Sequence, residues 1–128
     1  MKQYQSRELF KLGEDIATKH LLSCGYALVC RNYRKAGGEI DIIVEKNQRL
    51  IFCEVKTRTS HSLFTALASV SYRKQQRITQ TALKYINENP QYNNYLFRFD
   101  VLVLFYSPAT ETFSVKHYED AFLPVLTD

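Results

Sequence analysis

Apolar residues recur every three or four positions in two stretches of the chain, a spacing that is typical of amphipathic helices. The first stretch covers residues 6–24, where Ser6 can cap the start and Gly25 can end the helix in a left-handed turn. The second covers residues 71–89 and stops before Pro90, because a residue that precedes proline avoids the helical region. The apolar positions are Leu9, Leu12, Ile16 and Leu21 or Leu22 in the first stretch, and Ile78, Ala82, Tyr85 and Ile86 in the second.

Five further segments are rich in β-branched and aromatic residues, which favour strands. They cover residues 26–33, 40–45, 50–56, 96–105 and 112–117. The order is helix, three strands, helix and two strands, and an α/β sandwich with a mixed sheet between helices buries their apolar faces. The RKAGG segment at 34–38 is interpreted as a basic, flexible connection, and residues 59–70 as a loop with room for one helical turn.

Charged residues interrupt the central pair of strands, although charges are rare on buried strands unless they are paired or functional. If the turn is centred on residues 47–48, residues whose numbers sum to 95 oppose each other, so Asp41 opposes Glu54 and Glu39 opposes Lys56. Opposed residues share one face of a sheet, so these four side chains should meet in one patch. A three- or five-residue loop would break the alignment.

The other face of this hairpin is wholly apolar, which supports the register. It carries Ile40, Ile42, Val44, Ile51, Cys53 and Val55. Opposed carboxylates destabilise a sheet unless positive charge separates them, and two interpretations follow. Lys56 alone could complete a structural salt-bridge cluster. Alternatively, Asp41, Glu54 and the backbone carbonyl of Val55 could hold a divalent cation such as Mg²⁺, which favours few carboxylates plus water and phosphate. Lys56 would then orient or deprotonate a water.

Composition and charge narrow the function classes. A chain of 128 residues, 45% of them hydrophobic, is expected to form one domain spanning residues 1–128. The net charge of +4 divides into +7 over residues 1–80 (14 basic, 7 acidic) and −3 over residues 81–128 (3 basic, 6 acidic). Because the basic part also holds the charged hairpin, nucleic acid is a reasonable partner.

The cysteines and histidines argue against two other kinds of site. Three cysteines without a CxxC spacing favour free, buried thiols in a reducing cytosol over a disulfide framework or a zinc cage. The cysteines are Cys24, Cys30 and Cys53. The three histidines, His20, His61 and His117, are scattered along the sequence, which argues against a histidine metal site or a histidine base. The N-terminus has no signal-peptide core and the longest apolar run, at 101–106, is too short for a bilayer, so a soluble cytoplasmic protein with no membrane association is expected.

The hairpin motif resembles a known pattern. The sequence GEID at 38–41, followed after 12 residues by EVK at 54–56, is similar to the PD-(D/E)XK motif of restriction-endonuclease-like nucleases. Glu14 in the first helix is similar to the helix glutamate of archaeal Holliday-junction resolvases. Over most of the chain, the sequences NYR at 32–34, EVKTR, RKQQRI and RFD at 98–100 resemble the small bacterial YraN-like family.

The resemblance implies an αβββαβ core with Mg²⁺ or Mn²⁺ held by Asp41 and Glu54, Lys56 as a catalytic residue and Glu14 assisting. The implied activity is a metal-dependent endonuclease acting on DNA rather than RNA, with branched or flapped DNA as a candidate substrate. A non-catalytic nucleic-acid-binding or scaffold protein of the same fold is the alternative, since the superfamily includes inactive members. Because resolvase-like relatives are often dimers, a homodimer is compatible with the resemblance. The role of Glu39 stays open.

Several basic residues could contact a nucleic-acid backbone. They are Arg31, Arg34 and Lys35 before the hairpin, Arg58 after it, and Arg73, Lys74 and Arg77 in the second helix, which continues as a polar stripe through Gln80 and Lys84. The alternative is that these are the solvated strand end and the wet face of an amphipathic helix. Lys74 or Gln76 could reach the acidic patch. Asp100, beside Arg98 in a buried strand, is expected to be structural.

Overall fold

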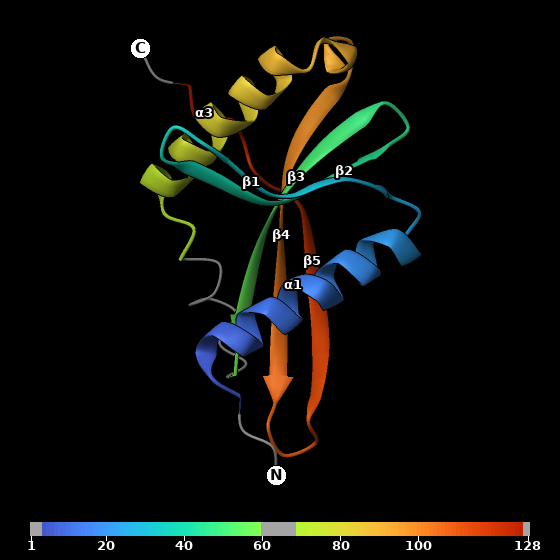
Figure 1. Ribbon diagram of the computed structural model, residues 1–128, viewed down its shortest axis with the longest axis vertical. Coiled ribbons are helices and arrows are strands. Elements are labelled where there is room, and N and C mark those ends of the chain that lie inside the picture. Colours follow the sequence, from blue (N-terminus) through green and yellow to red (C-terminus); the bar gives the residue numbers. More distant parts are fainter. Residues whose placement is uncertain (1–3, 60–68, 127–128) are drawn as a thin grey trace.

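The computed structural model describes residues 4–59 and 69–126, in which two helices flank a twisted five-stranded mixed sheet (Figure 1). The elements are α1 (Ser6–Ser23), β1 (Ala27–Lys35), β2 (Gly38–Lys46), β3 (Arg49–Arg58), α3 (Tyr72–Glu88), the 3₁₀ turn η1 (Pro90–Tyr92), β4 (Leu96–Ser107) and β5 (Thr112–Phe122). The sheet order is β1-β2-β3-β4-β5, and only β3 and β4 run parallel among these strands. This confirms the predicted αβββαβ order and is consistent with a restriction-endonuclease-like fold.

The ends of α1 are set by backbone geometry. Gln5, in extended conformation, is the N-cap and makes no side-chain capping bond, so the prediction that Ser6 caps the helix is wrong; Ser6 is already the first helical residue. Gly25, with φ of +91°, ends the helix in the predicted left-handed turn. There the N–H of Tyr26 donates to the carbonyl of Leu21 at 3.1 Å, which satisfies a carbonyl of the last turn.

The RKAGG segment is a tight turn and not a flexible connection. Lys35 lies opposite Gly38 as the last pair of the β1–β2 ladder. The two residues between them, Ala36 and Gly37, have φ of +47° and +84°. Positive φ at both central positions is the geometry of a two-residue hairpin turn that matches the twist of the strands. The prediction of a flexible connection was wrong because Gly37 supplies a positive φ that this turn requires.

The predicted register of the β2–β3 hairpin is confirmed over its paired length. Ile42 lies opposite Cys53 and Lys46 opposite Arg49, and both pairs sum to 95. Among the described residues the β2–β3 pairing stops at Ile42, whereas β2 stays paired with β1 back to Gly38. The predicted Asp41–Glu54 and Glu39–Lys56 pairs therefore lie just beyond the ladder, where β2 turns away from β3.

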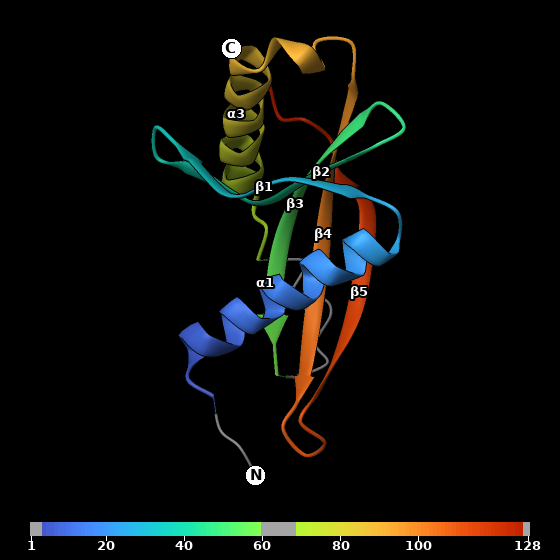
Figure 2. The same ribbon diagram turned by 45° about the vertical axis from the view of Figure 1, so that its right-hand side comes forward.

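Each face of the sheet packs against one helix (Figure 2). The core under α1 comprises Ala17, Leu21, Ile42, Val44, Ile51, Cys53, Val55, Leu102 and Leu104. The core under α3 includes Ile40, Ile43, Leu50, Phe52, Ile78, Ala82, Tyr85, Phe99 and Val101. All six residues predicted for the apolar hairpin face are buried, but Ile40 belongs to the α3 core and the other five to the α1 core. The backbone thus changes face near Asp41.

The remaining predictions concern the second half of the chain. α3 begins after Ser71, whose hydroxyl accepts the N–H of Lys74 at 3.2 Å, and it ends before Pro90 as predicted. β4 is buried through its centre, also as predicted. β5 extends to Phe122, beyond the predicted end at residue 117, past a register shift opposite Phe99. The predicted loop 59–70 falls mainly on residues 60–68, outside the described residues.

Candidate functional site

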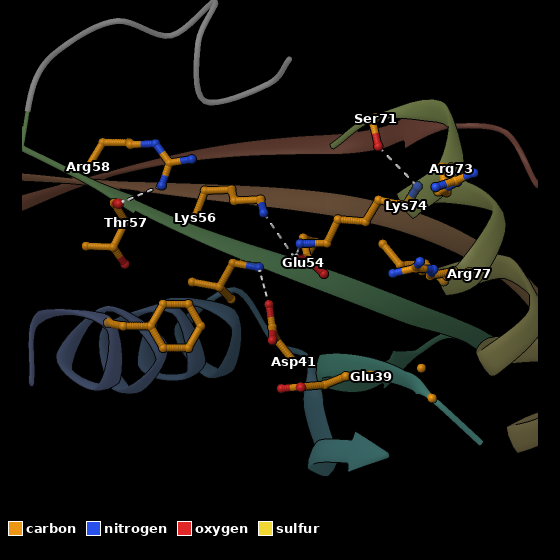
Figure 3. Close-up of a pocket in the computed structure, with 15 residues that line it drawn as sticks. Glu39, Asp41, Glu54, Lys56, Thr57, Arg58, Ser71, Arg73, Lys74 and Arg77 are labelled. Atoms are coloured by element: carbon orange, nitrogen blue, oxygen red, sulfur yellow. Dashed lines mark hydrogen bonds and ion pairs between the residues drawn. The ribbon is translucent and has the colours of Figure 1, made fainter. Parts of the chain in front are cut away.

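A cavity of about 570 Å³ lies between α3, the start of β2 and the second half of β3 (Figure 3). Its charged lining residues are Glu39, Asp41, Glu54, Lys56, Arg58, Arg73, Lys74 and Arg77. Phe10 of α1 and Thr57 and Ser71 also line it. The cavity therefore holds three carboxylates and five cationic side chains, drawn from β2, β3 and α3.

Asp41 is buried at the floor of the cavity, where β2 leaves β3. Its Oδ2 accepts the backbone N–H of Val55 at 2.8 Å, which ties the start of β2 to β3 beyond the last ladder pair. Burial, together with the negative charge of Glu54, raises the pKa of Asp41 to about 7. The charges of Glu14 and Glu39 act in the same direction, which places four carboxylates in one electrostatic neighbourhood.

Glu54 is buried beside Asp41 and is neutralised by two lysines. Lys74 Nζ lies 2.7 Å from Glu54 Oε1, and Lys56 Nζ lies 3.4 Å from the same atom (Figure 3). Burial is the largest influence and lowers the pKa of Lys74, but the hydrogen bond to Glu54, the contact with Lys56 and the charges of Glu54 and Asp41 together raise it, so the net shift is upward. Burial and the neighbouring Lys74 lower the pKa of Lys56, against the attraction of Glu54. Lys74 is thus the stronger partner of Glu54, and Lys56 is the more easily deprotonated amine.

Glu14 approaches the same neighbourhood from the buried face of α1. Its Oε1 is 3.4 Å from Arg31 Nη2, and its Oε2 is buried without a hydrogen bond to any described residue. Burial raises the pKa of Glu14, although Arg31 opposes the shift. Thr57 Oγ1 is a second buried polar atom without a partner among the described residues. Buried polar atoms are normally paired, so these two need a ligand or a water.

The donor set suits a hard divalent cation with an incomplete protein shell. Over residues 4–59 and 69–126, no three His, Cys, Asp or Glu side chains are arranged to hold a metal ion. Within those residues the protein alone therefore supplies no complete metal cage. Asp41 and Glu54 are two buried carboxylates whose repulsion raises the pKa of Asp41, and a cation between them would remove that repulsion. Mg²⁺ is commonly bound in this way, by one or two carboxylates with water and phosphate.

The predicted basic residues divide into two groups. Arg58, Arg73, Lys74 and Arg77 line the cavity. The other three basic residues do not line the cavity, and each forms an ion pair. Arg31 pairs with Asp15 at 2.9 Å. Arg34 pairs with Glu39 at 3.5 Å, and Lys35 with Glu88 at 2.6 Å. Gln76, Gln80 and Lys84 are not among the lining residues either. Of the two candidates to reach the acidic patch, Lys74 does so and Gln76 does not.

The prediction of buried cysteines needs one correction, and two histidines that are distant in sequence are in contact. Cys24 is exposed, not buried, whereas Cys53 is buried as predicted. His20 and His117 are 97 positions apart in sequence, but their rings stack edge to face with centroids 5.8 Å apart. No short-range sequence signal could have shown this, because the contact depends on how α1 crosses β5. His61 lies outside the described residues.

Asp100 is fully buried and is the centre of a separate hydrogen-bond network. It accepts hydrogen bonds from Arg98 at 2.8 Å, from the backbone N–H of Asp120 at 3.0 Å, and contacts His117 Nε2 at 2.7 Å. Burial alone would raise the pKa of Asp100, but His117 and Arg98 outweigh it and lower that pKa. The network joins β4 to β5, in agreement with the predicted structural role.

Known proteins share the segment that builds the cavity. The model of "Uncharacterised protein family UPF0102" matches residues 13–104. The chain belongs to the UPF0102 family. It is 36% identical over 119 residues to a UPF0102 protein of Clostridium botulinum strain Hall, covering 93% of this chain and 97% of the relative. It is 40% identical over 114 residues to one from Frankia casuarinae, covering 89% and 95%.

Membership of UPF0102 confirms the resemblance to the YraN-like family. Glu14, Asp41, Glu54, Lys56 and Lys74 all fall within the matched segment. In the part of the chain that the structure describes, neither helix of this UPF0102 protein is long and apolar enough to cross a membrane.

Proposed function

We propose that this UPF0102 protein is a divalent-metal-dependent endonuclease that hydrolyses phosphodiester bonds, in DNA rather than RNA. One observation carries the proposal: two buried carboxylates, Asp41 and Glu54, lie in a cavity whose rim is lined by Arg58, Arg73 and Arg77. Carboxylates attract a metal ion and arginines attract phosphate, so the two together suit a metal-assisted reaction at a nucleic-acid backbone. The PD-(D/E)XK-like motif and the order of elements around the sheet support the same proposal.

Asp41, Glu54 and the backbone carbonyl of Val55 would hold Mg²⁺ or Mn²⁺. When bound, such an ion polarises a phosphoryl oxygen and makes a bound water more acidic. Asp41 is already oriented for this role, because its Oδ2 accepts the N–H of Val55 and its other oxygen is left for a ligand. The Oε2 atom of Glu14, which has no partner among the described residues, is suited to accept a proton or a hydrogen bond from a water at the edge of this site.

The two lysines beside Glu54 have different roles in this proposal. Lys56 is half-buried with a lowered pKa, and this brings its amine closer to the range in which it can take a proton from water. Lys74 keeps its proton, since Glu54 raises its pKa, and it can stabilise negative charge that develops on the phosphate. Arg73 and Arg77, on the same helix, also line the cavity and can contact the phosphates of the backbone.

The test is cleavage of labelled junction, flapped, single-stranded and duplex DNA, and of matched RNA, with Mg²⁺ or Mn²⁺. We expect cleavage of at least one DNA substrate, loss of cleavage in Asp41→Asn and Glu54→Gln, and a large decrease in Lys56→Met. Glu45→Gln is the matched control, because Glu45 lies on β2 outside the cavity. Cleavage that survives both carboxylate substitutions would contradict the assignment of the site.

A second function, binding of nucleic acid without cleavage, is favoured by one observation. Glu54 already has two ammonium partners, Lys74 at 2.7 Å and Lys56 at 3.4 Å, so its charge is balanced without a metal ion. A non-catalytic binding or scaffold protein predicts salt-sensitive binding, no turnover on any substrate, and no change in Tm when Mg²⁺ or Mn²⁺ replaces EDTA. A metal-dependent rise in Tm that Asp41→Asn abolishes would exclude this alternative.

A further inference from the structure

Phe10 is the one aromatic side chain among the residues that line the cavity, over the described part of the chain. It lies three and four residues before Gly13 and Glu14 and seven before Ala17, so it belongs to the stripe of α1 that faces the sheet. The stripe is buried from Gly13 to Leu21, but Phe10 is 42% exposed. At Phe10 the helix has passed the end of the core, and its apolar stripe faces the cavity.

A second hollow adjoins the cavity at Phe10. It has a volume of about 580 Å³ and is lined by Ser6, Arg7, Leu9, Phe10, Thr57, Arg58 and Thr59. Phe10, Thr57 and Arg58 line both hollows, so they form the boundary between them. The second hollow has two arginines and no acidic residue in its lining, and it is therefore suited to the nucleotides that follow a phosphate placed at the proposed metal site of Asp41 and Glu54.

The cation at the boundary between the hollows, Arg58, is hydrogen-bonded to the protein. Arg58 donates to the carbonyl of Thr57 at 2.9 Å and to Ser69 Oγ at 3.2 Å, so its guanidinium is held in place. A fixed cation next to an exposed ring is the combination used to bind single strands, in which the backbone follows the positive charge and bases stack on aromatic faces. In a paired duplex each base is already stacked and its face is not available.

We propose that Phe10 stacks on an unpaired base next to the scissile phosphate, and that the substrate therefore has a single-stranded segment beside the cut. This inference rests on the proposed function, because it places nucleic acid in the same cavity. It adds the substrate class: flapped, gapped or single-stranded nucleic acid is bound in preference to an uninterrupted duplex. The contact is sequence-tolerant, since every base has a face that can stack.

A single tryptophan can report the stacking directly, because the chain has none. Phe10→Trp is titrated in EDTA, to prevent cleavage, with a short oligo(dT), a blunt duplex, and the same duplex with a dT flap. We expect saturable quenching by the oligo(dT) and the flapped duplex and little quenching by the blunt duplex. Leu22→Trp is the matched control: Leu22 is 47% exposed on the same helix but lines neither hollow, so its signal should not change.

Affinity supplies the second measurement. By fluorescence anisotropy of the labelled oligo(dT), we expect Phe10→Ala to weaken binding roughly 5- to 150-fold, Phe10→Tyr to retain it, and Leu22→Ala to leave it unchanged. If Phe10→Ala binds as wild type does, or Phe10→Trp is quenched equally by the blunt duplex at saturation, the stacking role is wrong while the proposed function stands. If wild type binds none of the three probes, nucleic-acid binding fails and the inference fails with it.

Discussion

Two buried aspartates, Asp41 on β2 and Asp100 on β4, have opposite electrostatic environments. Asp100 is surrounded by donors, from Arg98, His117 and the N–H of Asp120, and its pKa is lowered. Asp41 has one donor, the N–H of Val55, and its pKa is raised to about 7 by burial and by Glu54. A folded protein gains stability from the first arrangement and loses it in the second. Such unfavourable carboxylates are typical of functional sites, where a ligand removes the cost.

We expect Asp41→Asn to stabilise the metal-free protein at alkaline pH. Between the unfolded value near 3.8 and the folded value of about 7, the native state binds more protons than the unfolded state, so stability falls as pH rises. Above about pH 7 the folded protein bears the full free-energy cost of burying an ionised carboxylate at Asp41. The uncharged amide of the Asp41→Asn variant removes this cost, and its oxygen can still accept the Val55 N–H. In EDTA at about pH 8, urea unfolding should show a gain of about 1 kcal/mol or more.

The gain should nearly vanish at about pH 3, below the unfolded value of 3.8, because Asp41 is then mostly protonated in both states. Asp100→Asn is the control of opposite sign. Its lowered pKa contributes stability above its unfolded value, and that stability is lost as pH falls. Asp100→Asn should therefore destabilise at pH 8, by about 2–3 kcal/mol, and less at low pH. A destabilised Asp41→Asn at pH 8 would mean that Asp41 is a structural ion-pair member.

The sequence was sufficient to place residues whose position depends on local geometry. Asp41 and Glu54 followed from the alternation of side chains and from a two-residue turn, both of which act over a few residues. Lys74 was only one of two candidates, because helical spacing does not show how a helix is rotated over a sheet. Phe10 was not predicted at all, since its role depends on where α1 passes the end of the core.

At the scale of elements, a glycine sets how closely α1 approaches β3. A Cβ on Gly13 would collide with Thr57 Oγ1, and it would also lie 3.4 Å from Thr57 Cβ. The close approach brings the next residue, Glu14, down to the acidic neighbourhood of Asp41. Glycine weakens a helix interior, so its presence in the middle of α1 is explained by this contact and not by helix formation.

We expect Gly13→Ala to destabilise the protein by about 1–3 kcal/mol, although helix propensity alone predicts a gain of about 1 kcal/mol. The two effects have opposite signs, so the free energy of unfolding in urea decides between them. In a Thr57→Ala background the collision is removed, and there Gly13→Ala should be neutral or stabilising. A stabilised single variant would show that α1 can move away from β3 at no cost.

The elements themselves were predictable to different degrees. The β2–β3 register followed from one turn and one apolar face, because both constraints are local. The parallel pairing of β3 with β4 was not deduced, since the two strands are joined through α3 and the register of such a crossover is set by packing over a long connection. The end of β5 was missed because Glu119 and Asp120 lack β propensity, yet the Asp120 N–H is held by Asp100.

Across the whole molecule, the basic residues fall into two groups: some form ion pairs outside the cavity, and others line it. The first 80 residues carry seven more basic than acidic residues, a fact that the sequence gives directly. Which cations face a ligand is decided by the fold: Arg31 and Lys35 are ion-paired outside the cavity, whereas Arg73 and Arg77 line it. The composition therefore predicts a polyanion in general, and only the structure indicates where it binds.

This division leads to a prediction about salt dependence. Each phosphate that a protein cation neutralises adds about 0.7 to the magnitude of the slope of log K against log salt for a single strand. We expect Arg73→Gln and Arg77→Gln each to lower this slope by about 0.7 for single-stranded DNA, measured by anisotropy in EDTA. Lys84→Gln is the matched control, because Lys84 lies on α3 but not in the cavity, and its slope should equal that of wild type. If all three variants have the same slope as wild type, the nucleic acid binds elsewhere on the molecule.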